Sequence, residues 1–398
     1  MTHQTISFTE TELLKTLSTR MTCINPGLAE LEPYEFRYCM HPWHPAAGWE
    51  TVHTPPCHEI EQLIQSPGFY EDIQLKPKRD GAIVLDESIV KLNQALMAGL
   101  FSGAYSPAWV KQSFYFDIRG FYFLPRTLYF TDAVREHLNR APYRQFEQKQ
   151  KTLESVQDVG YRQFKEANAE IDACFIRAVQ KLIRIKGSPI VMAIAGPTAA
   201  GKTEIVERLH AAFAEEGQRT ASIEMDHFLT DRDEREARGI HSLGAHAIHL
   251  DLFLRCLTDI VAGRAITTPR YDFIDATSSH DLFGRLKPGG RPIHIEPADI
   301  IFIEGNFPFL IPEAAARIGI KVVYLTDDEI RLKRKWKRDI DYRKKYEPTY
   351  FRNRYFQSQF PMAQTCYIPQ LQLCDLAVDT TAAALWVTTH TAALLDGE

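Results

Sequence analysis

The chain has 398 residues, and 46 Lys and Arg against 51 Asp and Glu give it a formal net charge of −5 at pH 7. This length favours two domains, and the acidic balance argues against a general nucleic-acid binder. No secretory leader or run long enough to cross a bilayer is visible. The seven cysteines are scattered, which is typical of reduced thiols. We therefore expect a cytoplasmic protein that binds neither nucleic acid nor membrane.

Residues 1–185 are predicted to form a separate α+β domain. Short helices are expected over 9–21 and 86–100, and aromatic strands around a glycine turn predict a hairpin within 113–124. From about 142 to 185 the chain is rich in Gln, Glu, Lys and Ala with apolar residues at helical spacing, which indicates one long or broken helix. This domain could bind a substrate, a regulator or another subunit, so a homo-oligomer is one of the alternatives.

The N-terminal half also contains a group of residues of the types that bind zinc. Their spacing does not match a usual paired-ligand pattern, so an irregular aromatic loop is the alternative to a metal site. The residues are Cys39, His41, His44, His53, Cys57 and His58.

Residues 186–398 alternate short apolar runs with helical stretches. Runs of this kind are typical of parallel strands buried on both faces, and they predict a doubly wound α/β sheet. In such sheets ligands bind beyond the carboxyl ends of the strands. The runs lie at 189–195, 220–225, 299–303 and 320–325, with a weaker one at 376–379.

The first of these runs leads into a phosphate-binding loop of the pattern GxxxxGK[ST], which predicts ATP and Mg²⁺ as cofactors. Backbone N–H groups of such a loop and the start of the next helix bind phosphate oxygens. Lys202 would reach the β- and γ-phosphates, and the Thr203 hydroxyl would bind Mg²⁺. The loop residues are Gly196, Pro197, Thr198, Ala199, Ala200, Gly201, Lys202 and Thr203.

Acidic residues end the next three runs. Asp226 ends the second, Glu304 the third, and Asp327 with Asp328 the fourth. Phosphoryl transfer needs an acceptor for the proton of the attacking hydroxyl and a metal to neutralise the phosphates. We assign Asp226 as the base and Glu304 to the Mg²⁺ shell; the alternative is that both residues cap helices.

A basic helix is predicted after the fourth run. At 100° per residue, Arg331, Arg334, Lys335 and Arg338 fall on one face, opposite apolar residues. Cations on an anchored helix suit charge stabilisation of a transferring phosphoryl group, so Arg334 and Arg338 are candidate catalytic residues. A solvated basic face and a nucleic-acid patch are the alternatives.

The order of these motifs resembles the uridine kinase and phosphoribulokinase group of P-loop kinases over roughly 188–380. The resemblance implies that Lys202 and Thr203 bind ATP·Mg²⁺, that Asp226 is the catalytic Asp and that the arginine helix belongs to a lid. It also implies that Tyr271, with Arg270 beside it, contributes to the acceptor site. The matching pieces are the phosphate loop, Asp226-x-Phe228, Pro269-Arg270-Tyr271-Asp272-Phe273, 298–305 and Arg331-x-x-Arg334-x-x-x-Arg338-Asp339.

The chain departs from the group at positions that concern the acceptor. Ala276 stands where uridine kinases resemble one another in a His, and His246 where they carry an Asp. His249-x-Asp251 is instead similar to phosphoribulokinases. We therefore expect His246 and His249 to help bind an anionic or sugar-phosphate acceptor, since imidazolium pairs with phosphate; the alternative is that they are ordinary helix-start residues.

These residues favour a kinase that transfers the γ-phosphoryl group of ATP to a hydroxyl of a small molecule such as a nucleoside, a sugar phosphate or a related ribose-like compound. A nucleotide-hydrolysing switch would turn over without an acceptor, and a regulatory protein on an inactive scaffold would not turn over at all. Lys202, Thr203, Asp226 and Glu304 are all present, which argues against the inactive scaffold.

Overall fold

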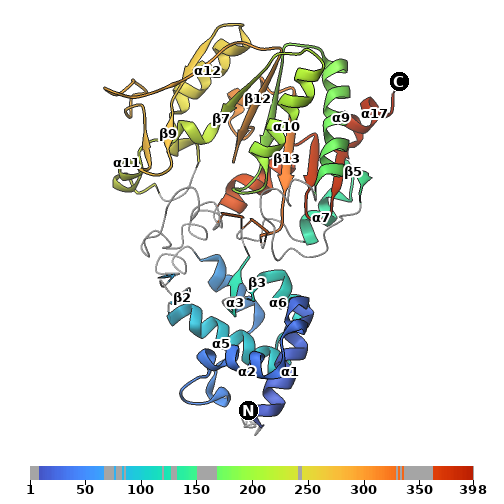
Figure 1. Ribbon diagram of the computed structural model, residues 1–398, viewed down its shortest axis with the longest axis vertical. Helices are drawn as coiled ribbons and strands as arrows, with labels where there is room; N and C mark the ends of the chain where they lie inside the picture. The colour runs from blue at the N-terminus through green and yellow to red at the C-terminus, as the bar shows by residue number, and fades with distance from the viewer. Residues whose placement is uncertain are drawn as a thin grey trace. The chain divides into compact units, whose positions relative to one another are not determined.

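The computed structural model divides the chain into two compact units (Figure 1): Met1–Leu128 with Tyr346–Gln357, and Tyr129–Lys345 with Ser358–Glu398. The change of unit near residue 128 precedes the segment 142–185, which the sequence pattern placed in the first domain. The residues described are 9–66, 76–77, 83–84, 87–118, 121–126, 132–149, 168–240, 244–328, 330–331, 334–335 and 362–397.

The described part of the first unit is mainly helical with two short hairpins, as the predicted α+β class requires. Thr9 caps the first helix in a capping box with Glu12. The buried Asn93 amide donates to Phe123 O at 3.0 Å and so ties a helix to the second hairpin. The helices are α1 (Glu10–Ile24), η1 (Pro26–Glu30), α2 (Pro33–Met40), η2 (His41–Trp43), η3 (Trp49–Thr51), α3 (Cys57–Gln65), α5 (Glu87–Ser102) and α6 (Pro107–Ser113); the hairpins pair β1 (Lys76–Pro77) with β2 (Ile83–Val84) and β3 (Phe114–Asp117) with β4 (Tyr122–Pro125).

A mostly parallel sheet forms the centre of the second unit. Its order in the described residues is β5-β15-β14-β13-β6-β12-β7. Strands β14, β13, β6, β12 and β7 run parallel, whereas β15 and β5 join antiparallel at one edge. The bounds are β5 (Tyr143–Gln148), β6 (Ile190–Ala195), β7 (Thr220–Glu224), β12 (Ile300–Gly305), β13 (Ile320–Leu325), β14 (Leu376–Asp379) and β15 (Ala384–Thr388).

Helices cover both faces of this sheet, which confirms the doubly wound class. Alternate residues of β6 point to opposite faces: Ile190, Met192 and Ile194 pack with α9 (Ala169–Lys186), α10 (Lys202–Glu215) and α17 (Thr389–Asp396). The residues between them pack with α7 (Asp132–Leu138), α12 (Leu250–Val261), α13 (Pro312–Ala315) and α16 (Ile368–Leu371).

The expected helix over 142–185 is wrong at its start. Residues 143–148 form β5, which pairs with β15 from Tyr143↔Thr388 to Gln148↔Ala384. The strand is polar and largely solvent-facing apart from the buried Tyr143, so its composition looked helical while its conformation is set by pairing with a distant strand. Among the described residues of this segment, the helix is α9, from Ala169 to Lys186.

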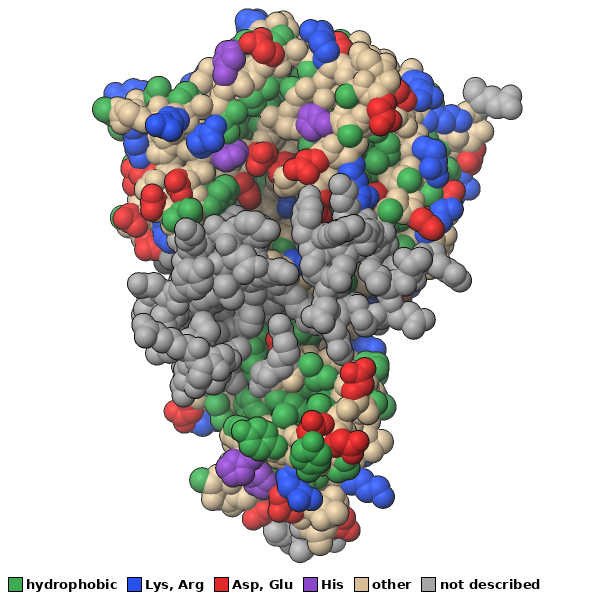
Figure 2. Space-filling model, in the orientation of Figure 1, with side chains coloured by type: hydrophobic (Ala, Val, Ile, Leu, Met, Phe, Trp, Pro, Cys, Tyr) green, Lys and Arg blue, Asp and Glu red, His purple; other side chains and the backbone are tan. Residues whose placement is uncertain are grey.

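Shorter elements connect or flank the strands of this sheet. They are η4 (Met225–Phe228), α11 (Arg232–Ala237), η5 (Ala245–Ala247), η6 (Ala363–Tyr367) and two small antiparallel pairs, β8 (Ile266–Thr268) with β11 (Ile293–Ile295) and β9 (Tyr271–Asp272) with β10 (Thr277–Ser278). On the face seen in Figure 2, acidic and basic side chains are both spread over the second unit. Within the described ranges, none of the helices has the length and apolarity to cross a bilayer.

Candidate active site

The phosphate-binding loop connects β6 to α10, as the motif predicts. Gly196 has φ 154°, and a Cβ built there would lie 2.6 Å from Tyr324 O, so a larger residue would collide with β13. Gly201 has φ 100° and stands immediately before α10. The two glycines therefore let the chain leave a central strand, turn tightly and enter a helix whose N-terminus faces the loop.

Side chains from three segments donate to the carbonyl groups of this loop: the start of α10, the residue that follows β13, and the basic helix. Lys202 Nζ donates to Gly196 O at 2.9 Å and to Pro197 O at 3.0 Å. Thr326 Oγ1 donates to Ala200 O at 3.0 Å. Because these carbonyls bond to surrounding side chains, the loop has the arrangement in which its amide groups can converge on an anion.

The two described arginines of the basic helix complete this set. Arg331 donates to Thr198 O at 3.3 Å and is fully buried, paired with Asp328. Arg334 donates to Ala199 O at 2.9 Å and pairs with both carboxylate oxygens of Glu204 on α10, at 2.8 and 2.7 Å. The helical periodicity grouped these arginines correctly. The structure places them against the loop backbone rather than on a solvated face.

Thr203 and Glu304 meet at the first turn of α10. Thr203 Oγ1 donates to Glu304 Oε1 at 2.8 Å. The other carboxylate oxygen, Glu304 Oε2, is buried and has no hydrogen-bond partner among the described residues. A buried anionic oxygen without a donor is costly, so this atom marks a position where a cation would be favourable.

Several charged groups surround Glu304 and perturb its acidity. Burial raises the pKa of Glu304 to about 7, the Glu224 carboxylate and then Asp226 act in the same direction, and Lys202 opposes them. Glu224 lies opposite Glu304 in the β7–β12 register. The strand-end acids and the loop lysine therefore interact within one site, as their positions at neighbouring strand ends require.

Asp226 lies in η4, directly after β7, and is half-buried. The N-cap of the next α-helix, α11, is Asp231, and Glu304 bonds to Thr203 rather than to a helix end. The capping alternative thus does not describe either acid in this structure.

Tyr271 lies buried on β9, where its backbone and ring have different partners. Its N–H donates to His227 Nδ1 at 3.1 Å, and its hydroxyl accepts from Arg235 Nη2 at 3.1 Å. Because His227 accepts at Nδ1, its proton is on Nε2, which lies 3.6 Å from Glu224 Oε2. Tyr271 is thus linked through one imidazole to the strand end that precedes Asp226.

The two histidines expected to bind an anion differ in their surroundings. His246 is exposed, on η5. His249 is buried, and its Nε2 lies 3.3 Å from Ser278 Oγ. Burial, together with His280, lowers the pKa of His249 to about 4, so its ring is neutral at pH 7 and does not supply the positive charge that we expected. Arg270 is exposed, and Arg338 lies outside the described residues.

The model for the phosphoribulokinase/uridine kinase family matches residues 191–385. This part of the chain is a phosphoribulokinase/uridine kinase family domain. It is 30% identical to uridine kinase-like protein 4 of Arabidopsis thaliana over 162 residues, which are 39% of this chain and 31% of that protein. It is also 30% identical to the uridine kinase of Limosilactobacillus reuteri (strain DSM 20016) over 158 residues, which are 38% of this chain and 66% of that kinase. The chain thus spans less than two thirds of either relative.

Among solved structures, the putative fructose transport system kinase of Silicibacter sp. TM1040 is 17% identical with a TM-score of 0.39, covering 51% of this chain and 94% of that one. The phosphoribulokinase of Rhodobacter sphaeroides is 17% identical with a TM-score of 0.36, covering 48% of this chain and 69% of that one. The family domain contains the loop, Asp226, Tyr271 and Glu304, whereas Met1–Leu128 of the first compact unit lies outside the matched range.

Three residues of the family domain's site were not identified from the sequence. Glu224 acts on Glu304, His227 joins Tyr271 to Glu224, and Arg235 holds the Tyr271 hydroxyl. Glu224 and His227 flank Asp226 closely, so proximity to a predicted catalytic residue was the available signal. Arg235 gave no signal, because only the fold brings α11 against β9.

The Cys39–His58 cluster of the first unit does not form a metal centre in the structure. Through the described ranges, no three His, Cys, Asp or Glu side chains are grouped so that they could hold an ion. His44 instead packs edge-on against Trp49, with ring centroids 5.6 Å apart. Cys39, His41, Cys57 and His58 lie in helices, so only the segment around His44 and His53 matches the alternative of an irregular aromatic loop.

Proposed function

We propose that the protein is an ATP-dependent kinase that transfers the γ-phosphoryl group to a hydroxyl of a small molecule, such as a nucleoside, a sugar phosphate or a related ribose-like compound. The observation that carries the proposal is the unpartnered Glu304 Oε2, buried beside the Thr203 hydroxyl and within electrostatic reach of Lys202 and Asp226. Two uridine kinase relatives at 30% identity support the same reaction class.

The loop from Gly196 to Thr203 would hold the triphosphate of ATP. Its carbonyls already bond to side chains, which leaves amide groups and the N-terminus of α10 for phosphate oxygens. Lys202 lies over the loop, with its ammonium on two loop carbonyls. An anionic phosphate is a better partner for this ammonium than a neutral carbonyl.

Thr203 and Glu304 fit a Mg²⁺ ion, since hydroxyl and carboxylate oxygens are the donors it prefers. The bound ion would supply charge neutralisation of the phosphates. It would also remove the cost of burying the Glu304 charge, because Oε2 is available and Thr203 Oγ1 is adjacent.

Asp226 is the candidate base. As the acceptor oxygen forms its bond to phosphorus, the hydroxyl proton passes to the Asp226 carboxylate and the bond to the leaving oxygen breaks. Arg334, which holds the loop through Ala199 O, and Arg338, from the same predicted helix, are the candidates for stabilising the developing charge.

The acceptor would bind on the β9 side, near Tyr271, Arg270, His246 and His249. His249, being neutral, offers hydrogen bonds to hydroxyl groups rather than an ion pair. Arg235 and His227 hold Tyr271 in one position, so its ring would help to orient the acceptor. We place the reaction in the cytoplasm, with no nucleic-acid or membrane partner.

The test is an acceptor screen with ATP·Mg²⁺ over nucleosides, sugar phosphates and pantothenate-like alcohols. Formation of ADP and the mass of the phosphorylated product are both measured. We expect one acceptor class to give product and ADP in equal amounts, Lys202→Ala to weaken ATP use, and Asp226→Asn to lose about 10²–10⁴ of the rate while ATP affinity is kept.

Asp233→Asn is the matched control, because Asp233 is an exposed carboxylate on α11 of the same unit; it should leave turnover unchanged. ADP formation that needs no acceptor and is insensitive to Asp226→Asn would refute the proposal in favour of a nucleotide-hydrolysing switch.

A further inference from the structure

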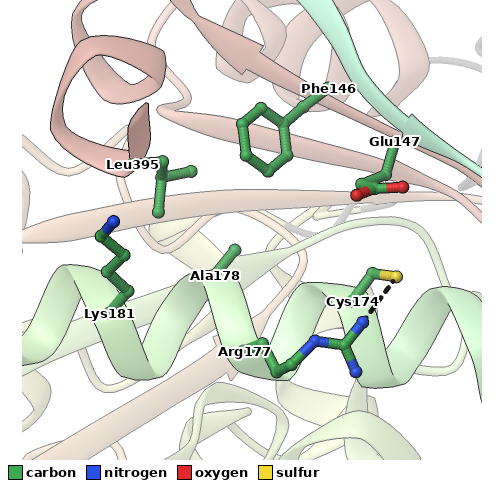
Figure 3. A pocket seen from close by; sticks show the side chains of 7 residues that line it. All are labelled: Phe146, Glu147, Cys174, Arg177, Ala178, Lys181 and Leu395. Carbon is green, nitrogen blue, oxygen red and sulfur yellow. Dashed lines mark hydrogen bonds between the residues drawn. The ribbon is translucent and has the colours of Figure 1, made fainter. Parts of the chain in front are cut away.

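A cavity of about 160 Å³ opens in the second unit between β5, α9 and α17 (Figure 3). Phe146, Ala178 and Leu395 give it an apolar lining. Ala178 and Leu395 are buried, and Phe146 is partly exposed. An enclosed apolar cavity of about 150 Å³ holds one benzene-sized molecule; this pocket has a similar volume but is open to solvent, so it suits a single small ring that stays partly exposed.

The charged groups of the same cavity are mainly basic. Arg177 and Lys181 come from successive turns of α9, and Glu147 comes from β5 (Figure 3). Glu147 is already paired with Lys149 at 3.1 Å. Because Lys149 offsets the charge of Glu147, the two cations of α9 give the lining a net positive charge, which favours an anionic ligand.

A contact within α9 orients one of these cations. Arg177 Nη2 donates to the buried Cys174 Sγ at 3.1 Å, as the dashed line in Figure 3 marks. This bond uses one of the five guanidinium donors. The others can bind a carboxylate, which pairs with a guanidinium through two parallel hydrogen bonds.

The cavity is separate from the candidate active site. It includes β5 at one edge of the sheet, whereas Glu304 and Glu224 are on β12 and β7 at the opposite edge. The phosphate loop follows β6, and β13, β14 and β15 lie between β6 and β5. A ligand in the cavity would thus contact neither the loop nor the strand-end acids.

We propose that this cavity is a second ligand site, which binds a small carboxylate with one apolar ring or a branched body of similar size. The ring lies against Phe146, Ala178 and Leu395, and the carboxylate pairs with Arg177, while Lys181 at the other end of the pocket adds to the positive potential. The proposal does not depend on the identity of the kinase acceptor, because the site uses different residues.

Benzoate is the probe, and its binding to the full chain is followed by ligand-observed NMR titration. Benzyl alcohol keeps the ring and removes the charge, and benzylamine reverses the charge. We expect saturable benzoate binding, with benzyl alcohol up to about fivefold weaker and benzylamine weaker still, because an exposed ion pair contributes up to about 1 kcal/mol.

Two variants and one matched control locate the binding. Ala178→Leu fills the cavity and should abolish binding, and Arg177→Gln, at an exposed position, should weaken it about fivefold without affecting the fold. Arg184→Gln is the control, because Arg184 is on the same helix but pairs with Glu216 at 2.9 Å; it should bind benzoate as the wild type does.

Three results would overturn the proposal. One is the absence of saturable benzoate binding. The second is equal binding of benzoate and benzylamine. The third is displacement of benzoate by ATP together with normal binding to Arg177→Gln, which would place the anion on the phosphate loop. Kinase turnover is measured separately, so loss of the cavity site and failure of the proposed function are distinguishable.

Discussion

Replacing Glu304 by glutamine should change how the stability of the metal-free protein depends on pH. Burial, assisted by Glu224, raises the pKa of Glu304 from its ordinary 4.5 to about 7. Between these two values the folded state holds a proton that the unfolded state has lost. Stability therefore falls as the pH rises through this window.

The size of the effect follows from the shift. A rise of about 2.5 in pKa corresponds to roughly 3 kcal/mol of unfavourable free energy once the buried carboxylate is ionised. Glu304→Gln carries no such proton, and its amide oxygen can still accept from Thr203 Oγ1. Relative to the wild type, the free energy of unfolding of the variant should thus rise by roughly 3 kcal/mol between pH 4 and pH 8.

The assay is urea unfolding of both proteins at several pH values in the presence of a chelator. At each pH the free energy of unfolding of the wild type is subtracted from that of the variant. This removes the contributions that both proteins share, including those of the first unit. Glu215→Gln, at an exposed position on α10, is the control and should show a constant difference. The reasoning would be refuted if the free energies of unfolding of the wild type and Glu304→Gln changed in parallel with pH. It would also be refuted if the advantage of the variant grew toward low pH.

Three further substitutions test the loop and its surroundings. Gly196→Ala should weaken binding of a fluorescent nucleotide about tenfold or more, because the added Cβ meets β13, whereas Gly217→Ala, with φ 72° but open space around it in the described residues, should not. Arg334→Lys should destabilise the protein by about 2 kcal/mol in urea unfolding, since a single ammonium cannot hold both Glu204 and Ala199 O, as the two guanidinium nitrogens do at this largely buried site, and the double variant with Glu204→Gln should recover part of it. His249→Gln should remove an acid sensitivity: with its pKa lowered to about 4, His249 makes the wild type lose stability as the pH falls from 6.5 through 4, which thermal unfolding across that range measures.

The parallel strands could be predicted from the sequence because each is a continuous apolar run buried on both faces. The predicted run at 189–195 contains β6 (Ile190–Ala195), and the weaker one at 376–379 coincides with β14. The antiparallel strands could not be predicted in the same way. β5 carries mostly polar residues, and its conformation depends on pairing with β15 more than two hundred positions later.

The positions of the acids at the candidate site were easier to predict than their electrostatic surroundings. Residue type and position at a strand end identified Asp226 and Glu304, because parallel strands bring their carboxyl ends to one edge. The protonation of His249 could not be read in this way. Its neutral state depends on burial and on His280, thirty-one positions away, and periodicity contains no information about either.

The contacts of the arginine helix could not be predicted from helical periodicity either, and they indicate what holds the phosphate-binding loop in its conformation. Helical spacing indicates that Arg331 and Arg334 share a face, but not what that face contacts. In the structure they donate to Thr198 O and Ala199 O, so the carbonyls of the loop are held by residues about 130 positions further along the chain. A glycine-rich loop has many accessible conformations, and these donors select one of them. The phosphate-binding geometry is therefore a property of the loop together with the segment after β13, and substitutions in that segment should alter nucleotide affinity even where they do not touch the nucleotide.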